Sequence, residues 1–265
     1  PPHTFLLPKR RFRITIGKNA QGGDAVEHWD ELWRGGYRFC FGDGAFKPST
    51  DTFLLGGFAQ VRQGERVCDL GAGIGLLGLL LLAREATLRV TNVDVSERAC
   101  AMARQTAAVN GLEERVTVLC ADLRRREQLP EANSFDLCTA NPPYFPSAAG
   151  RVAAGQRGIA RAELTCTFDG LCTAAAYLLR SGGRFSVVHR AERTAELLET
   201  LRRHRLEPKE LRFVQKDSAA LPRLVLLTCR RDGGTGLTVH TPLLLQNDDG
   251  SDSDELRRIY FRDRG

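Results

Sequence analysis

The stretch VCDLGAGIG at residues 67–75 decides the fold of this chain. Its apolar first residues predict a short buried strand, and the leucine-rich run at 76–82 predicts the start of a helix. Between them, Gly71, Gly73 and Gly75 allow a sharp turn and let a ligand approach the backbone without a Cβ in the way. The amides at the start of the helix would face that ligand. The stretch therefore predicts a strand, a ligand-binding turn and a helix.

The glycine pattern by itself leaves the ligand open. Gly73, Gly75 and Gly78 spell GxGxxG, which fits a dinucleotide site and also a turn that binds nothing. Asp69 stands just before the first glycine. Its carboxylate would repel a pyrophosphate but attract the ammonium and sulfonium groups of S-adenosylmethionine (SAM). The turn therefore favours SAM.

The bulk composition is that of a globular protein. The 265 residues are enough for one large α/β domain, with 42% hydrophobic and 26% charged residues. No apolar run is long enough to span a bilayer and no signal sequence opens the chain, so we expect a cytoplasmic protein. The net charge of +6 is compatible with a polyanionic partner. The eight cysteines include no CxxC pair, so we expect a reduced, structural role for them and no metal site.

Strands and helices alternate after the glycine turn, which predicts a parallel sheet with helices on both faces. The expected strands are 66–70, 88–93, 116–120, 135–140 and 184–189, followed by an antiparallel pair at 210–214 and 224–228. The expected helices are 52–61, 74–84, 96–110, 162–179 and 193–204, the first with Thr50 or Asp51 near its N-cap. We therefore expect a Rossmann-like α/β fold with a mostly parallel seven-stranded sheet and a C-terminal antiparallel hairpin.

Three segments follow from the pattern of glycines and charges. Residues 1–46 would form an N-terminal arm and a small β-cap, because glycines cut 29–46 into short apolar stretches. Residues 47–245 would form the SAM-binding domain. Residues 246–265 would form an acidic C-terminal tail, of which 246–254 read as flexible and 259–261 could dock back onto the domain.

Three aspartates stand at the carboxyl ends of successive predicted strands, where open parallel sheets bind their ligands. Asp69 is the first. Asp94 lies about twenty residues beyond the turn, where a carboxylate accepts both ribose hydroxyls of either NAD or SAM. Asp122 could accept a hydrogen bond from an adenine amino group. Each of the last two could also be a helix N-cap or a loop aspartate.

The Asn-Pro-Pro-Tyr stretch at 141–144 follows another predicted strand into the same crevice. The two prolines fix the backbone, so the Pro142 carbonyl and the Asn141 side-chain oxygen can converge on one planar NH₂ group. Tyr144 would stack on the ring that bears this amine. Acceptors on both hydrogens favour positive charge on the nitrogen and aim its lone pair at the SAM methyl group. The stretch therefore predicts methyl transfer to a conjugated amine.

At these residues the chain resembles the SAM-dependent amino-methyltransferases that carry an Asn-Pro-Pro-Tyr motif. More narrowly, it resembles the bacterial tRNA (adenine-N6) methyltransferase family that modifies the adenosine 3′ of the anticodon in a valine tRNA. The narrower resemblance spans roughly residues 30–262. It rests on KPSTDTFLLG at 47–56, IARAE at 159–163 and PLL at 242–244.

The resemblance implies SAM as cofactor, tRNA as partner, and roles for individual residues. The implied cofactor-binding residues are Thr50, Asp51, Asp69, Gly71, Gly73, Asp94 and Asp122. The implied catalytic residues are Asn141, Pro142 and Tyr144, and the implied substrate-binding residues are Pro143, Arg151 and Arg157. Of these, the two arginines would belong to a lid or an RNA contact after the tyrosine.

Several other functions share parts of this pattern. Enzymes that methylate a glutamine amide in peptide-release factors use the same four residues but usually add an N-terminal helical domain. DNA adenine methyltransferases normally carry a recognition domain, for which this chain has little room, and ribosomal guanine methyltransferases share the chemistry. A SAM-fold protein that binds RNA without catalysis, and an NAD-dependent oxidoreductase, are the remaining alternatives.

Overall fold

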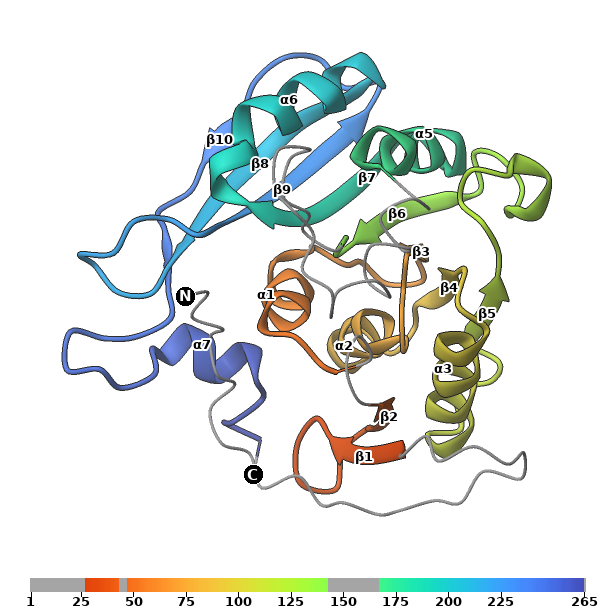
Figure 1. Ribbon diagram of the computed structural model, residues 1–265, viewed down its shortest axis with the longest axis horizontal. Helices are drawn as coiled ribbons and strands as arrows, with labels where there is room; N and C mark the ends of the chain where they lie inside the picture. Colours follow the sequence, from red (N-terminus) through yellow and green to blue (C-terminus); the bar gives the residue numbers. More distant parts are fainter. Residues whose placement is uncertain (1–26, 43–46, 143–166, 265) are drawn as a thin grey trace, which may run out of the picture.

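A central sheet with helices on both faces organises the molecule (Figure 1). The computed structural model describes residues 27–42, 47–142 and 167–264. Its strands are β1 (Glu27–Glu31), β2 (Arg38–Gly42), β3 (Arg66–Leu70), β4 (Arg89–Asp94), β5 (Val116–Cys120), β6 (Phe135–Ala140), β7 (Leu179–Arg190), β8 (Leu206–Gln215), β9 (Leu224–Arg231), β10 (Thr238–Val239) and β11 (Leu243–Leu244). Its α-helices are α1 (Thr50–Phe58), α2 (Leu76–Arg84), α3 (Glu97–Val109), α5 (Phe168–Leu178), α6 (Thr194–Arg203) and α7 (Asp254–Ile259).

The strand order of the main sheet is β10-β8-β9-β7-β6-β3-β4-β5, with β11 also paired to β8. Strands β3 to β7 pair in parallel, and β9 is antiparallel to both β7 and β8. The expected mostly parallel sheet of seven strands with a C-terminal antiparallel hairpin is therefore confirmed. Two dipeptide strands, β10 and β11, extend it beyond the expectation by pairing in parallel with β8.

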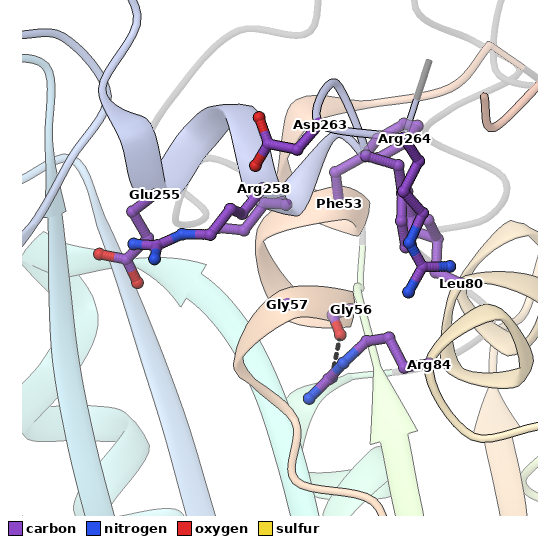
Figure 2. A pocket seen from close by; sticks show the side chains of 11 residues that line it. Phe53, Gly56, Gly57, Leu80, Arg84, Glu255, Arg258, Asp263 and Arg264 are labelled. Carbon is purple, nitrogen blue, oxygen red and sulfur yellow. Dashed lines mark hydrogen bonds between the residues drawn. The ribbon is translucent and has the colours of Figure 1, made fainter. Parts of the chain in front are cut away.

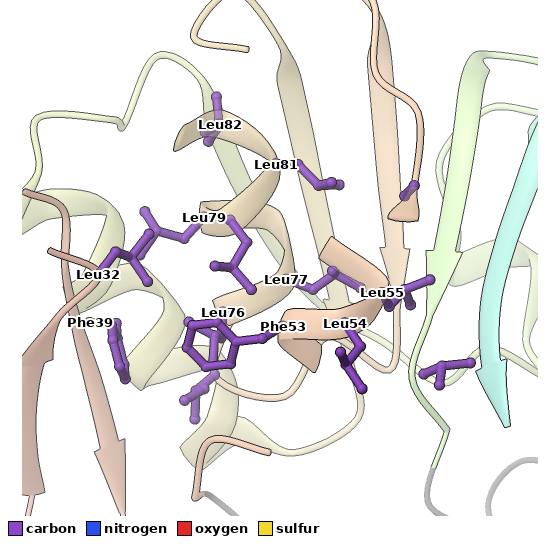
Figure 3. Packing of buried hydrophobic residues seen from close by; sticks show 14 of the residues in the cluster. Leu32, Phe39, Phe53, Leu54, Leu55, Leu76, Leu77, Leu79, Leu81 and Leu82 are labelled. Carbon is purple, nitrogen blue, oxygen red and sulfur yellow. The ribbon is translucent and has the colours of Figure 1, made fainter. Parts of the chain in front are cut away.

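The two faces of the sheet have separate hydrophobic clusters. Helices α1, α2 and α3 cover one face, and α5 and α6 cover the other (Figure 1). Figure 3 shows the first cluster, in which the leucines of α2 meet Phe53 of α1 and Leu32 and Phe39 of the β1–β2 hairpin. Residues 76–82 of α2 are all buried, because this helix is enclosed on every side.

Helix α2 lies unusually close to β4, and glycine makes this possible. A Cβ on Gly78 would lie 2.7 Å from Asn92 Oδ1 and 2.8 Å from Val90 Cγ1. A Cβ on Gly75 would lie 2.8 Å from Asn92 Nδ2. The glycine signature therefore serves the packing of α2 on the sheet as well as the turn that precedes it.

Segments from both ends of the described chain pack on the α1–α3 side. The β1–β2 hairpin is the expected β-cap, and the backbone N–H of Cys40 donates to Thr106 Oγ1 of α3 at 3.0 Å. The C-terminal tail forms α7 after the N-cap Ser253, and Gln246 pairs with Asp252 in the stretch that we expected to be flexible. The Tyr260 ring stacks on Phe53 with centroids 4.4 Å apart, and Tyr260 and Phe261 are 2% and 8% exposed. The expected docking of 259–261 is therefore confirmed.

Some element boundaries differ from the sequence-based expectation. Helix α5 begins at Phe168, where the Thr167 side chain caps it by accepting from the Gly170 N–H, and the expected start at 162 lies outside the described residues. It ends at Leu178, since Leu179 already pairs with Phe135 across an irregular point in the β6–β7 register. Among the described residues, no helix is long and apolar enough to cross a membrane.

Candidate active site

The glycine turn lies at the carboxyl ends of β3 and β4. The backbone N–H groups of Gly71 and Ala72 donate to the Val93 carbonyl at 2.8 and 3.0 Å, which fixes the turn to β4. Gly71, Gly73 and Gly75 have φ values of 70°, 53° and 75°, a region that favours glycine. At Gly71 and Gly73, a Cβ would meet no described atom within 4 Å. The space above the turn can therefore admit a ligand against bare backbone.

Asp94 joins this turn to the start of α3. Its Oδ2 accepts the Gly73 N–H at 2.7 Å, and its Oδ1 accepts the Ser96 N–H at 2.8 Å. Each carboxylate oxygen has a second lone pair, so both can still accept a hydroxyl. The structure thus brings Asp94 to the position expected of a ribose-binding carboxylate.

Asp69 lies inside the sheet rather than on its rim. It is 2% exposed, and its Oδ1 accepts the Thr139 hydroxyl from β6 at 2.8 Å. Burial raises the pKa of this carboxyl to about 7, against the hydrogen bond from Thr139, which lowers it, and with the nearby Asp94, which raises it further. A cationic ligand at the turn would favour the ionised form.

The Asn-Pro end of β6 meets the first turn of α1. The Asn141 Nδ2 donates to Thr52 Oγ1 at 2.9 Å and to Ser49 Oγ at 3.2 Å. Thr50 and Asp51 are in this same turn, and their expected contact with the cofactor stays a prediction. The N-cap is Ser49, rather than Thr50 or Asp51, because its side chain accepts the Thr52 N–H at 3.3 Å.

Asp122 is held by its own loop after β5. Its carboxylate accepts the Arg124 side chain at 2.6 Å and the Arg124 backbone N–H at 3.0 Å. The bond from Arg124 lowers the pKa of Asp122, so this carboxylate is ionised. An adenine amino group would share these oxygens with Arg124, and the contact with adenine stays a prediction.

Two contributions to the site were not predicted from the sequence. Ser49 and Thr52 were not expected to touch the motif, because they are 92 and 89 positions away from Asn141. Val95 follows Asp94 and is 50% exposed. Its place directly after the strand-end aspartate was the available signal, and a planar ligand group above the turn could cover it.

Four predicted site residues lie outside the described part of the chain: Pro143, Tyr144, Arg151 and Arg157. Their roles in holding the target base and the RNA stay predictions. Within the described ranges, no group of three or more His, Cys, Asp or Glu residues could hold a metal ion.

A pocket of about 410 Å³ lies between α1, α2 and α7, away from these residues (Figure 2). None of the predicted site residues lines it. Arg84 enters it from α2 and donates to the carbonyls of Gly56 and Ala59, so it closes the last turn of α1. We interpret this pocket as a gap in the packing of α7 on the domain.

Comparison with known proteins identifies the class to which this fold and turn belong. Residues 41–214 match the family model of the methyltransferase small domain, and the chain is a SAM-dependent methyltransferase. A solved structure described as a predicted O-methyltransferase from Agrobacterium tumefaciens has the same fold, with a TM-score of 0.66 at 22% identity. That likeness covers 80% of this chain and 96% of the other.

Similarity to curated proteins identifies the family within this class. The chain is 32% identical to the tRNA1(Val) (adenine(37)-N6)-methyltransferase of Dickeya chrysanthemi, over 84% of this chain and 91% of the relative. It is 34% identical to the protein of the same name from Serratia proteamaculans, over 81% of this chain and 82% of that one. The chain therefore belongs to the tRNA1(Val) (adenine(37)-N6)-methyltransferase family.

Proposed function

We propose that this protein transfers a methyl group from SAM to the exocyclic N6 of an adenine in tRNA, at position 37 of a valine tRNA as its relatives are named. The observation that carries the proposal is the juxtaposition of Asn141 and Pro142 with the glycine turn. The register supports it, because Asp69 of β3 pairs with Thr139 of β6, two residues before Asn141. A ligand above the turn and an amine at Asn141 would thus lie at one edge of the sheet.

The residues at this edge fit SAM. Gly71 and Gly73 leave room against the backbone, Asp94 offers carboxylate oxygens to the ribose, and Asp69 provides the only buried carboxyl that we find beneath the turn within the described chain. When bound, SAM supplies an electrophilic methyl group. No metal ligand is needed for this chemistry.

The chain's own part in the reaction is to orient the amine. The lone pair of adenine N6 is delocalised into the ring, which makes the nitrogen a weak nucleophile. The Asn141 Oδ1 and the Pro142 carbonyl would accept its two hydrogens, stabilise the positive charge that develops on N6, and direct the lone pair out of the ring plane. No strong base is required, because the proton can leave after transfer.

The partner and the compartment follow from the same proposal. A net charge of +6 favours association with a polyanion such as tRNA. A tRNA substrate would be met in the cytoplasm, so the cytoplasmic location stays a prediction that depends on the substrate.

Methyl transfer from labelled SAM tests the proposal. We expect label in tRNA from cells that lack the gene, recovered as N6-methyladenosine, and at least a 100-fold loss of kcat in Asn141→Ala, on the scale of a lost oxyanion-type contact. Asn247→Ala serves as the matched control, because Asn247 binds Ser251 in the turn before α7. Label in a peptide-release factor, and none in tRNA, would instead establish glutamine-amide methylation. SAM binding without transfer to tRNA, ribosomal RNA, DNA or release factor would contradict the enzymatic proposal.

A further inference from the structure

We infer that Ser49 and Thr52 are positioning residues that set the orientation of the Asn141 amide, and through it the geometry of methyl transfer. This inference rests on the proposed function. It concerns the first turn of α1, which carries neither the glycine turn nor the Asn-Pro-Pro-Tyr motif. The contact joins the N-terminus of α1 to the carboxyl end of β6.

The hydrogen bonds around the amide favour one of its two orientations. Both hydroxyl oxygens accept from Asn141 Nδ2, at 3.2 Å for Ser49 and 2.9 Å for Thr52. The two hydroxyls also bond to each other at 3.0 Å, which consumes one of their two hydrogens. A flipped amide would present Oδ1 to a pair with a single remaining O–H, so it would exchange two hydrogen bonds for at most one.

The Ser49 oxygen is itself held in place. It accepts the backbone N–H of Thr52 at 3.3 Å as the N-cap of α1. Because the cap fixes Ser49 to the helix, the pair of hydroxyls moves only with α1. Helix α1 in turn is packed into the core through Phe53, Leu54 and Leu55, which are at most 3% exposed. The Asn141 amide is therefore positioned by a helix that is fixed in the core.

The chemistry depends on this orientation. With Nδ2 fixed on the α1 side, Oδ1 lies on the opposite side of the amide group and can accept from a target amine. A flipped amide would set an NH₂ donor against the NH₂ group of the base, which removes an acceptor and adds a repulsive contact. Loss of the Thr52 hydroxyl would raise the fraction of such flipped molecules and lower kcat without touching the cofactor site.

Thr52→Val tests the inference, since it removes the hydroxyl and keeps the shape. We expect kcat to fall about twofold with unchanged SAM affinity, because Ser49 alone offers either amide orientation one hydrogen bond and the two orientations become about equally populated. Thr52→Ser should restore most of kcat. Thr173→Val is the matched control, because the Thr173 hydroxyl donates to the Asp169 carbonyl of its own helix at 3.0 Å. Thr52→Ala replaces the valine variant if that protein does not fold.

A second readout does not depend on turnover. The side-chain NH₂ signals of Asn141, assigned by their loss in Asn141→Ala, should exchange faster with solvent in Thr52→Val than in the wild type. Wild-type kcat in Thr52→Val, an equal loss in Thr52→Ser, or unchanged exchange of the amide would each overturn the inference. Failure of the wild type to methylate tRNA would contradict the proposed function alone, because the exchange measurement still decides the role of Thr52.

Discussion

At the scale of single residues, the two strand-end carboxyls of the site have different surroundings. Burial inside the sheet disfavours the ionised form of Asp69, and the hydrogen bond from Thr139 compensates for part of this effect. Asp94 is partly exposed, and two backbone N–H groups donate to its carboxylate. The two carboxyls of this crevice therefore differ in burial and in their hydrogen-bond partners.

Asp69 gives the folded protein a pH dependence. Its pKa is about 7 when folded and near 3.8 when unfolded, so the folded chain keeps a proton that the unfolded chain has released. The free energy of unfolding of the protein without ligand therefore falls as pH rises from about 4 to about 7. We expect Asp69→Asn, which cannot ionise, to lack this component and to gain stability relative to the wild type across that interval.

Urea unfolding of both proteins at pH 5, 6, 7 and 8 measures the difference. Asp263→Asn, at an exposed position, should follow the wild type at every pH. A constant difference between Asp69→Asn and the wild type from pH 5 to 8 would show that Asp69 does not titrate there.

Some features of the site could be predicted from the sequence because they depend on neighbouring residues. Others could not, because they depend on contacts between distant parts of the chain. The positive φ values of the glycine turn and the place of Asp94 follow from a few neighbouring residues, and the structure has them as expected. The contact of Ser49 and Thr52 with Asn141 joins distant parts of the chain. Only the packing of α1 beside β6 brings them together, and no local pattern encodes that.

At the scale of elements, the docking of α2 against β4 determines where the turn stands. Gly78 is the point of closest approach, with Asn92 and Val90 filling the place of a side chain. We expect Gly78→Ala to lower the free energy of unfolding by about 1 kcal/mol, because overpacking of about 1–3 kcal/mol exceeds the gain of up to about 1 kcal/mol in helix propensity.

Chemical denaturation measures the change in the free energy of unfolding, and SAM affinity is a second, independent measurement on the same variant. Displacement of α2 should weaken SAM binding in Gly78→Ala, because the helix follows directly from the turn. Gly234→Ala has open space around the new Cβ and should change stability by less than about 0.5 kcal/mol. A Gly78→Ala protein as stable as the wild type would mean that the helix and β4 adjust freely.

Helix and strand types were predictable, but several of their ends were not. The apolar runs fix the type, whereas the end of α5 depends on the pairing of Leu179 with Phe135 on another strand. The polar and acidic composition of 246–254 predicts a flexible tail. Its order comes from the apolar side of α7, which packs so closely on α1 that a Cβ on Gly57 would lie 2.7 Å from Ile259 Cγ1.

At the scale of the whole molecule, the cap and the tail share the hydrophobic cluster on the α1–α3 side of the sheet. Leu32 of the hairpin, Phe53 of α1 and Phe261 after α7 belong to the same hydrophobic cluster. Trp33 also contacts Phe261, with ring centroids 5.2 Å apart. The division into 1–46, 47–245 and 246–265 thus describes segments of the sequence, and we propose that the described parts of these segments unfold together.

Tryptophan fluorescence and circular dichroism distinguish joint unfolding of the segments from independent unfolding of the cap. Both tryptophans, Trp29 and Trp33, belong to the β1–β2 segment, so their emission reports the cap, while far-UV dichroism reports the whole chain. We expect the two denaturation curves to coincide, as in a two-state transition. An earlier transition in fluorescence would show that the cap unfolds independently.

The two dipeptide strands beside β8 have a consequence for association between molecules. An edge strand with free N–H and C=O groups is a template onto which another chain can add, and this is a route to aggregation. Here β10 pairs with Glu210 and Leu211, and β11 pairs with Val214 and Gln215. A second molecule could add a strand along β8 only after residues 238–244 had dissociated from it. The pairing of these residues with β8 therefore protects this edge against β-polymerisation.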